Sequence, residues 1–161
     1  MTEQKAFMKI CIIAAALCIQ FISAAALDSG QDAIVGIWNN EEKDARIEIF
    51  RCDNKYCGKV VWISKPVYSP DEDAARTGMQ RADDKNPNPE LRGRRIIGLQ
   101  IMSGFDYKGN QRWAGGRLYD PKTGKTYSGR MTLTSIDRLE LKGYVVFSFF
   151  GRTSVWTRVQ Q

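Results

Sequence analysis

Short stretches rich in Val, Ile, Thr and aromatic residues alternate with Gly, Pro, Asn and Asp along most of this chain. After residue 26, no segment has the apolar period of a long amphipathic helix. This pattern is typical of an all-β domain. We expect strands near residues 34–39, 45–52, 57–64, 94–103, 111–119, 125–134, 138–147 and 152–159. Strands of this number and length, joined mainly by short turns, fit a closed antiparallel barrel or a two-sheet sandwich.

Glycines in the expected strands favour the barrel over the sandwich. They stand in or beside the strands at Gly98, Gly115, Gly116, Gly129, Gly143 and Gly151. Glycine weakens a strand unless a bend, a bulge or a close approach requires it. Repeated strand glycines are therefore typical of a sheet that coils and closes. We predict a small closed or nearly closed antiparallel barrel of about eight strands.

The first 26 residues predict a cleavable secretory signal. Lys5 and Lys9 outweigh Glu3, an apolar run follows from Ile10 to Ile22, and Ala24–Ala26 supplies small side chains before the expected cleavage. The run of about 13 residues is shorter than the roughly 20 needed to span a bilayer, so it is not expected to be a transmembrane anchor. We expect an exported protein, periplasmic or secreted.

The mature chain, residues 27–161, is expected to form a single domain around one hydrophobic core. Of 24 basic and 18 acidic residues, the signal holds two lysines and one glutamate, so the mature net charge is +5. The charges are scattered, as on an ordinary solvated surface, and affinity for anionic lipid head groups is the alternative. Nucleic acid is a poor partner, because no recognition helix or base-stacking module is visible. No motif indicates a cofactor.

Cys52 and Cys57 are the cysteines of the mature chain. In an oxidising compartment, a pair at this spacing indicates a disulfide. A closed zinc site requires four Cys or His ligands, and the chain has no histidine, so no metal site is expected.

A disulfide between directly opposite cysteines would set the register of the first hairpin. Ile47 would then face Trp62, and Ile49 would face Val60. The four apolar side chains would share one face of the hairpin. This register predicts that Trp62 points into the barrel.

A long connection interrupts the short turns at residues 65–93. It holds four of the five prolines, and strand patterns stop there. Such a length without strands is typical of a lid, a functional loop or disorder. Helical turns are expected around Asp71–Gly78 and Pro89–Arg92.

Several fragments together resemble one bacterial exported family, catalogued as domain of unknown function 2147. They are GIWNN, YCGKVVWISKP, DDKNPNPELRGRRIIGLQI, WAGGRLYDPKTGKTYSGRMTL and LKGYVVFSFFGRTSVWTRV. The resemblance spans nearly the whole mature chain. It implies a barrel of the lipocalin or fatty-acid-binding type. It implies no activity and no catalytic residues.

Carboxylates are the candidates for acid–base chemistry, because the chain lacks histidine. Asp83, Asp84 and Glu90 are the nearest acidic group in the long connection, and paired carboxylates can catalyse hydrolysis. Acids in exposed loops are usually solvated. The run Asp84, Asn86, Asn88 has the alternating oxygens of a calcium loop but lacks its glycine and its distant glutamate. Capping of the loop by Asp84 and Asn86 is the simpler expectation.

Aromatic residues give candidate ligand contacts. Each of four expected strands carries a tryptophan, and in a small barrel such side chains either fill the interior or line a cavity. These are Trp38, Trp62, Trp113 and Trp156. The candidate contacts in the interior are Trp38, Trp62, Trp113, Tyr127 and Met131.

Three arginines, Arg92, Arg94 and Arg95, stand where the long connection enters the fourth expected strand. At a barrel rim, Arg92 or Arg94 could hold a ligand carboxylate with two hydrogen bonds. An ion pair with a loop acid such as Asp84 or Glu90 is the alternative.

These observations lead to three ranked functions. The first is a non-enzymatic barrel that binds a small apolar or amphipathic molecule. The second is an envelope interaction or scaffold protein with a solidly packed barrel. The third is a carboxylate-based hydrolase.

Overall fold

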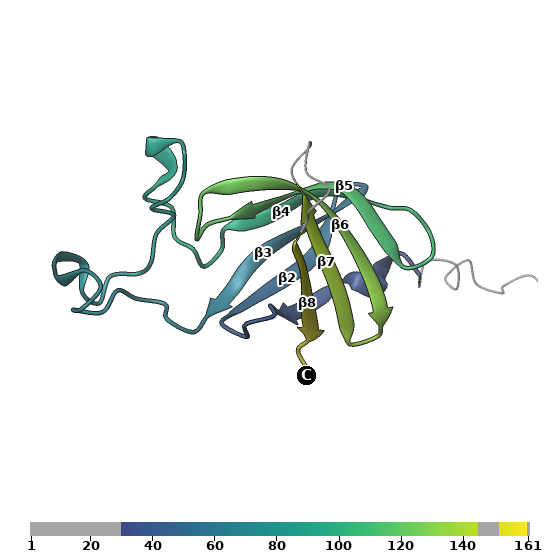
Figure 1. Cartoon of the computed structure of the whole chain (residues 1–161), viewed down its shortest axis with the longest axis horizontal. Helices are drawn as coiled ribbons and strands as arrows, with labels where there is room; N and C mark the ends of the chain where they lie inside the picture. Colours follow the sequence, from purple (N-terminus) through teal and green to yellow (C-terminus); the bar gives the residue numbers. More distant parts are fainter. Residues whose placement is uncertain (1–29, 145–151, 161) are drawn as a thin grey trace, which may run out of the picture.

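The structure, a computed structural model, describes residues 30–144 and 152–160. It is a closed antiparallel barrel (Figure 1). Each strand pairs with its neighbour in the sequence, and β8 pairs with β1. The strands are β1 (Gly36–Asn39), β2 (Ala45–Cys52), β3 (Lys55–Ile63), β4 (Gln100–Tyr107), β5 (Arg112–Asp120), β6 (Lys125–Ser135), β7 (Arg138–Tyr144) and β8 (Arg152–Arg158). The predicted all-β barrel is confirmed. The predicted signal, residues 1–26, and residues 145–147 of the seventh expected strand lie outside the described residues. No helix in the described part of the chain is long and apolar enough to cross a membrane.

The fourth strand begins later than predicted. We expected it at residues 94–103, whereas β4 runs from Gln100 to Tyr107. Gly98 has a φ of +91°, and the Leu99 N–H donates to the Ile96 carbonyl at 3.1 Å, so a turn precedes the strand. The connection between β3 and β4 therefore extends over residues 64–99, which we call the long segment.

One end of the barrel is closed by a single 3-10 turn, η1 (Asp32–Ile34). Ile34 is fully buried, and its carbonyl accepts a hydrogen bond of 2.9 Å from Trp38 Nε1. Arg158 of β8 stacks over the Trp38 ring at 4.2 Å and donates to the Ala33 carbonyl at 2.6 Å. These contacts join the first and last strands under η1, and we call this the closed end.

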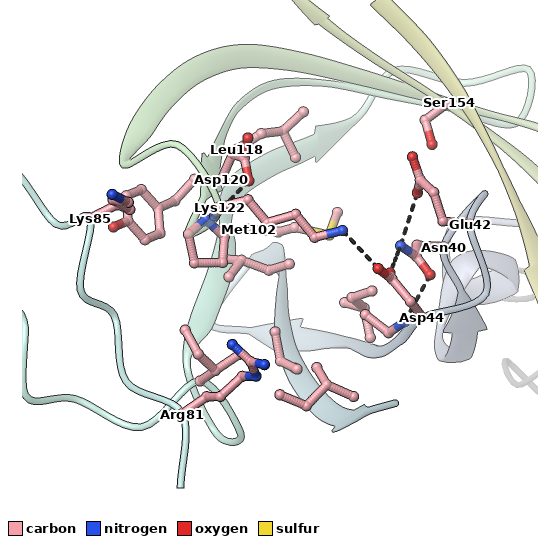
Figure 2. A pocket seen from close by; sticks show the side chains of 18 of the residues that line it. Asn40, Glu42, Asp44, Arg81, Lys85, Met102, Leu118, Asp120, Lys122 and Ser154 are labelled. Carbon is pink, nitrogen blue, oxygen red and sulfur yellow. Dashed lines mark hydrogen bonds and ion pairs between the residues drawn. The ribbon is translucent and has the colours of Figure 1, made fainter. Parts of the chain in front are cut away.

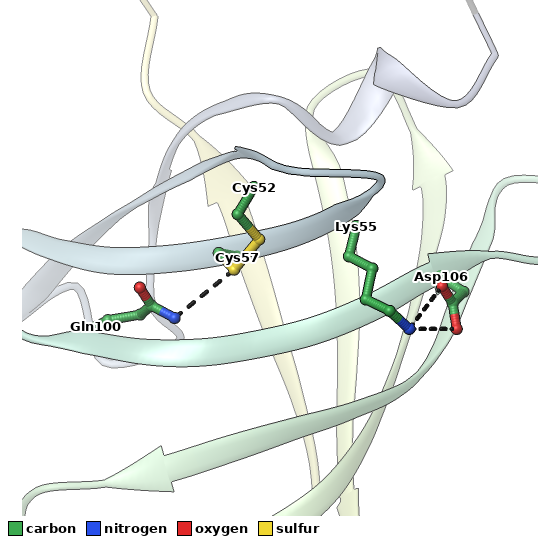
Figure 3. Close-up of a disulfide and its surroundings, with 5 residues drawn as sticks. All are labelled: Cys52, Lys55, Cys57, Gln100 and Asp106. Carbon is green, nitrogen blue, oxygen red and sulfur yellow. Dashed lines mark hydrogen bonds and ion pairs between the residues drawn. A yellow bond between two sulfur atoms is a disulfide. The ribbon is translucent and has the colours of Figure 1, made fainter.

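The predicted disulfide between Cys52 and Cys57 is present (Figure 3). The turn is tighter than expected, because β3 starts at Lys55 and Asp53 takes a φ of 55°. Cys52 lies opposite Lys55, and Cys57 lies opposite Phe50. The cysteines are thus diagonal neighbours, with Cα atoms 5.8 Å apart, rather than directly opposite.

The predicted register of this hairpin is wrong, and so is the inward orientation of Trp62. Ile47 lies opposite Val60, and Arg46 lies opposite Trp62, so Val61 is an extra residue at a bulge. A bulge of one residue moves the following side chains to the other face of the sheet. Trp62 is accordingly 38% exposed on the outside, where the Arg46 guanidinium stacks over its ring at 4.8 Å.

Toward the closed end, the barrel interior is solidly packed. Phe105 is fully buried, and it occupies space left by two glycines of neighbouring strands. A Cβ at Gly116 would lie 2.2 Å from the Phe105 ring, and one at Gly129 would lie 2.8 Å from it. The buried residues around Phe105 include Trp38, Ile49, Tyr56, Met102, Trp113, Met131, Leu133 and Leu139. Strand glycines thus make room for a large side chain in the core.

Candidate functional site

A cavity of about 840 Å³ lies at the other end of the barrel, which we call the open end (Figure 2). The connections at this end include residues 40–44, the long segment and residues 121–124. The apolar side chains that line the cavity include Ile47, Val60, Met102, Leu118, Leu141 and Trp156. The interior is therefore filled at the closed end and hollow at the open end.

The alternation of side chains along β5 and β6 places this apolar lining. Leu118 lies opposite Tyr127 in the register of the two strands, and both side chains line the cavity. Further along, where Gly116 lies opposite Gly129, the Phe105 ring fills the interior. Leu118 and Tyr127 therefore mark the boundary between the packed core and the cavity.

Charged side chains surround the mouth of the cavity, and several are paired. Lys122 Nζ lies 2.8 Å from Asp44 Oδ2, and this hydrogen bond lowers the pKa of the Asp44 carboxyl. Asn40 donates to Asp44 at 2.6 Å and to Glu42 at 3.0 Å. Arg152 lies 2.9 Å from Glu42. This side of the rim is an ion-pair network that spans the β1–β2 and β5–β6 connections.

The long segment supplies the other side of the rim, through Lys65, Arg81 and Lys85 among others. Arg81 donates to Glu72 at 2.6 Å and to the Lys65 carbonyl at 2.8 Å, so its charge is compensated. In the described chain, the ammonium groups of Lys65 and Lys85 have no ion-pair partner. The rim thus offers two cations outside close ion pairs beside the apolar lining, with Asp71 near Lys65 and Asp84 near Lys85.

Tyr68 organises the first half of the long segment. Its hydroxyl donates to Asp84 at 2.6 Å and accepts from Arg76 at 3.1 Å and from the Ala82 N–H at 3.1 Å. Arg76 also pairs with Asp84 at 2.8 Å, and its hydrogen bond lowers the pKa of that carboxyl. The 3-10 turn η2 (Ala74–Arg76) lies within one of the two predicted helical turns.

Asp83 anchors the second half of the long segment to the barrel. Its carboxylate is fully buried and accepts from the Tyr119 hydroxyl of β5 at 2.5 Å, from Asn86 Nδ2 at 2.7 Å and from Arg94 at 3.0 Å. Burial, together with the hydrogen bond to Asp83, raises the pKa of Tyr119 to about 12, so the hydroxyl keeps the proton that it donates. The second predicted helical turn is η3 (Pro89–Leu91).

A close backbone approach adds to this anchor. The β5–β6 turn passes Lys85 so closely that a Cβ on Gly124 would lie 1.9 Å from the Lys85 carbonyl oxygen. Gly124 also has a φ of +72°, which disfavours any other residue. The turn and the long segment therefore hold each other at one side of the cavity mouth.

The predicted aromatic and apolar contacts separate into three places. Tyr127 lines the cavity. Trp38, Trp113 and Met131 are buried in the packed core toward the closed end and are not among the described lining residues. Trp62 lies on the outer surface.

The predicted rim arginines serve the long segment itself. Arg94 forms an ion pair with Asp83. We expected such a pair as the alternative to ligand binding, with Asp84 or Glu90 as the acid. Arg92 Nε donates to the Asn86 carbonyl at 2.9 Å. Neither arginine is among the described residues that line the cavity. Arg95 forms an isolated bridge with Ala82.

The candidate carboxylates also have structural partners. Asp83 and Asp84 hold the two halves of the long segment. The Asn86 side chain accepts from the Asn88 N–H at 2.9 Å, as the capping prediction expected, whereas the Asp84 carboxylate accepts from the side chains of Tyr68 and Arg76. Glu90 is exposed in the first turn of η3. No cluster of potential metal ligands occurs in residues 30–144 and 152–160.

Sequence reasoning missed several residues at the site. Leu118 and Leu141 line the cavity from β5 and β7, and Lys122 pairs across its rim. The alternation of apolar and polar residues in β7 would have indicated Leu141, whereas Leu118 faces inward only because of the extra residue Gly115 in β5. The sequence held no sign that Lys122 and Asp44, which are far apart in the chain, would meet.

Comparison with known proteins agrees with this architecture. The fold is similar to the solved structure of protein HP1028 from Helicobacter pylori, which is described as belonging to the lipocalin family. The similarity has a TM-score of 0.65 at 25% sequence identity, over 78% of this chain and 82% of that one. No curated protein matches the sequence. Residues 36–158 match the model of a bacterial family, described as uncharacterized protein conserved in bacteria (DUF2147), and the chain therefore belongs to this family.

Proposed function

We propose that this protein binds a small apolar or amphipathic molecule in the cavity at the open end of its barrel. The observation that carries the proposal is a cavity of about 840 Å³ with a largely apolar lining. This volume lies in the range of about 300–1,000 Å³ that is typical of small-molecule sites. The similarity to a protein described as a lipocalin supports the same reading.

The charges of the rim favour a ligand with an acidic end. Lys65 and Lys85 lie beside the apolar lining without an ion-pair partner in the described chain, so an anionic group there would gain charge complementarity. Lys122 and Arg152 already face carboxylates at the opposite side of the mouth. The polar end of the ligand would therefore lie toward the long segment.

Mass spectrometry of the purified protein tests whether a ligand is bound. Organic extraction should release a stoichiometric small molecule. A fluorescent amphipathic anion, 1-anilinonaphthalene-8-sulfonate, should bind to the extracted protein and quench or shift the emission of Trp156, which lines the cavity.

A cavity-filling variant makes the test specific. Ala45 lines the cavity, so Ala45→Trp should abolish binding of the fluorescent anion. Ala114 lies beside the inward-facing Trp113 and opposite Arg130 on the outer surface, so Ala114→Trp adds the same bulk outside and should bind normally. Equal binding by both variants would contradict the proposal.

We also propose that the protein acts after export from the cytosol. The amino-terminal sequence pattern and the Cys52–Cys57 disulfide support this location. Cell fractionation with thiol labelling tests it: the protein should appear in the periplasm or medium, shortened by about 26 residues and without a free thiol. A reduced, full-length cytosolic protein would contradict it.

A further inference from the structure

Cationic side chains gather on the outer surface of three neighbouring strands. Trp113, Met131 and Leu141 point inward and are buried, so their neighbours in β5, β6 and β7 point outward. Three of these outward positions hold the cations Arg112, Arg130 and Lys142, and Arg117 of β5 lies on the same side; we call these four residues the basic face. The strands β5, β6 and β7 are adjacent in the barrel (Figure 1).

The strand register brings the four cations close together. Arg130 of β6 lies directly opposite Lys142 of β7, which places their Cβ atoms about 5 Å apart. Arg112 lies opposite Thr132, the outward neighbour of Arg130, and is therefore diagonal to Arg130. Arg117 is diagonal to it on the other side.

A bulge is needed to bring Arg117 to this face. Gly115 has a φ of +80° and is the extra residue between Ala114 and Gly116 in the pairing with β6. Without the bulge, Arg117 would share the inward face with Trp113. The irregular pairing at Gly115 therefore turns Arg117, the third arginine of the basic face, toward the outside of the barrel.

The charges on this face are not compensated in the described part of the chain. Like charges directly opposite each other in a sheet, as in Arg130 and Lys142, lower stability. The acids nearby are Glu140 of β7 and Asp106 of β4: Glu140 forms no ion pair with these cations in residues 30–144 and 152–160, and Asp106 pairs with Lys55 and Lys108. On the far side of the barrel, by contrast, Glu48 and Lys59 lie opposite each other and pair at 3.0 Å.

The neighbours of these cations favour a phosphate-rich lipid surface. On β6, Ser128 and Thr132 flank Arg130 and place hydroxyl donors opposite Arg117 and Arg112 of β5. Guanidinium groups bind phosphate oxygens with paired hydrogen bonds. At the closed-end edge of the same hairpin, Ile136 is 76% exposed in the β6–β7 turn. An exposed apolar side chain beside a cationic face suits a bilayer interface better than a soluble polyanion.

We propose that the basic face, with Ile136 at its edge, docks the protein onto the surface of an anionic phospholipid bilayer. The contact would be electrostatic and peripheral, with each cation strengthening binding about fivefold. Such docking would bring the β6–β7 turn at the closed end to the membrane, and it requires no particular occupant of the cavity. The inference is therefore independent of the proposed ligand binding.

Vesicle co-sedimentation tests this docking. Wild-type protein should bind vesicles of phosphatidylglycerol and phosphatidylcholine, should bind pure phosphatidylcholine vesicles weakly, and should dissociate between about 50 mM and about 500 mM NaCl. The triple variant R112Q/R117Q/R130Q should bind the anionic vesicles about a hundredfold more weakly. The charge-preserving R112K/R117K/R130K should retain most of the affinity, and Ile136→Ser should lower it several-fold without changing the salt dependence.

A control of equal net charge separates the basic face from general attraction. K43Q/R46Q/K59Q removes three cations from the β1–β3 side of the barrel and should bind like the wild type. Equal losses in this control and in R112Q/R117Q/R130Q would overturn the proposal. Binding to neutral vesicles with the same affinity, or binding to heparin without binding to anionic vesicles, would overturn it as well.

Discussion

The hydrogen bond from Tyr119 to Asp83 should determine how firmly the long segment is held to the barrel. The Tyr119→Phe substitution removes the 2.5 Å donor to one carboxylate oxygen and leaves Asn86 at 2.7 Å and Arg94 at 3.0 Å on the other. The aromatic ring stays, so the packing around it changes little. The substitution therefore isolates the hydroxyl group.

The expected magnitude follows from the burial of the Asp83 carboxylate. It is fully buried, so water cannot replace the lost donor. A hydrogen bond to a charged group contributes about 1.5–3 kcal/mol. Arg94 is 45% exposed, so its ion pair is screened and compensates little. We expect local opening to become easier by about 2 kcal/mol, which corresponds to about a thirtyfold change in the opening equilibrium.

Native-state hydrogen exchange measures this opening directly. The Asp83 N–H donates to the Arg94 carbonyl at 2.8 Å, and the Asn86 N–H donates to the Asp83 carbonyl at 2.9 Å, so both amides report on the anchor. Their exchange should accelerate about thirtyfold in Tyr119→Phe. Tyr127→Phe is the matched control, since the Tyr127 hydroxyl has no hydrogen-bond partner in the described residues. Similar exchange rates in the two variants would refute the assignment of Asp83 as an anchor.

Two further predictions concern the core and the long segment. Gly116→Ala should lower the free energy of unfolding in urea by about 1–3 kcal/mol, because its Cβ would meet the Phe105 ring at 2.2 Å. Gly143→Ala, whose Cβ would have its nearest contact at 3.6 Å, should change it by less than about 0.5 kcal/mol, and equal losses would contradict the packing argument. The hydrogen bond from Arg81 lowers the pKa of Glu72 to about 2, so the charged carboxylate stabilises the long segment above the pKa of an unfolded glutamate, and this contribution is lost as the pH falls toward 2. A carboxyl NMR titration should find this low midpoint, which Arg81→Gln should raise toward the value of free glutamate while the two hydrogen bonds from Ser69 remain; an ordinary midpoint in the wild type would contradict the pairing.

Alternating side chains predicted the strands well, because half-buried antiparallel strands repeat every two residues. The alternation of side chains does not predict the β-bulges. Val61 and Gly115 each shift the alternation by one position, which turns Trp62 outward and Arg117 outward. An extra residue in one strand is defined only by its partner strand, so a single strand pattern does not reveal it.

The long segment was predictable in its local features and not in its anchors. Asp73 and Asn88 cap the turns η2 and η3 through contacts within three residues, and such contacts leave a sequence signal. The bond between Asp83 and Tyr119 joins residues 36 positions apart. Nothing in either local sequence marks the other as its partner.

The barrel interior is filled at one end and hollow at the other. The sequence predicts that Trp38 and Tyr127 share one interior, whereas Trp38 is buried in the core and Tyr127 lies on the cavity wall. Phe105 separates the packed core from the cavity, because its ring fills the space that side chains at positions 116 and 129 would occupy. The solid packing that the scaffold hypothesis expected describes only the half of the barrel toward the closed end.

The seam between β1 and β8 has a consequence for how the chain folds. Trp38 and Asn39 pair with Arg158 and Thr157, so the barrel closes between its earliest and its latest strand. A nascent chain on the ribosome cannot complete this closure before the last strand has been synthesised. Contacts between such distant residues slow folding, because the intervening chain must be ordered first. Until then, the backbone hydrogen-bonding groups on the free edge of β1 lack the partners that β8 supplies.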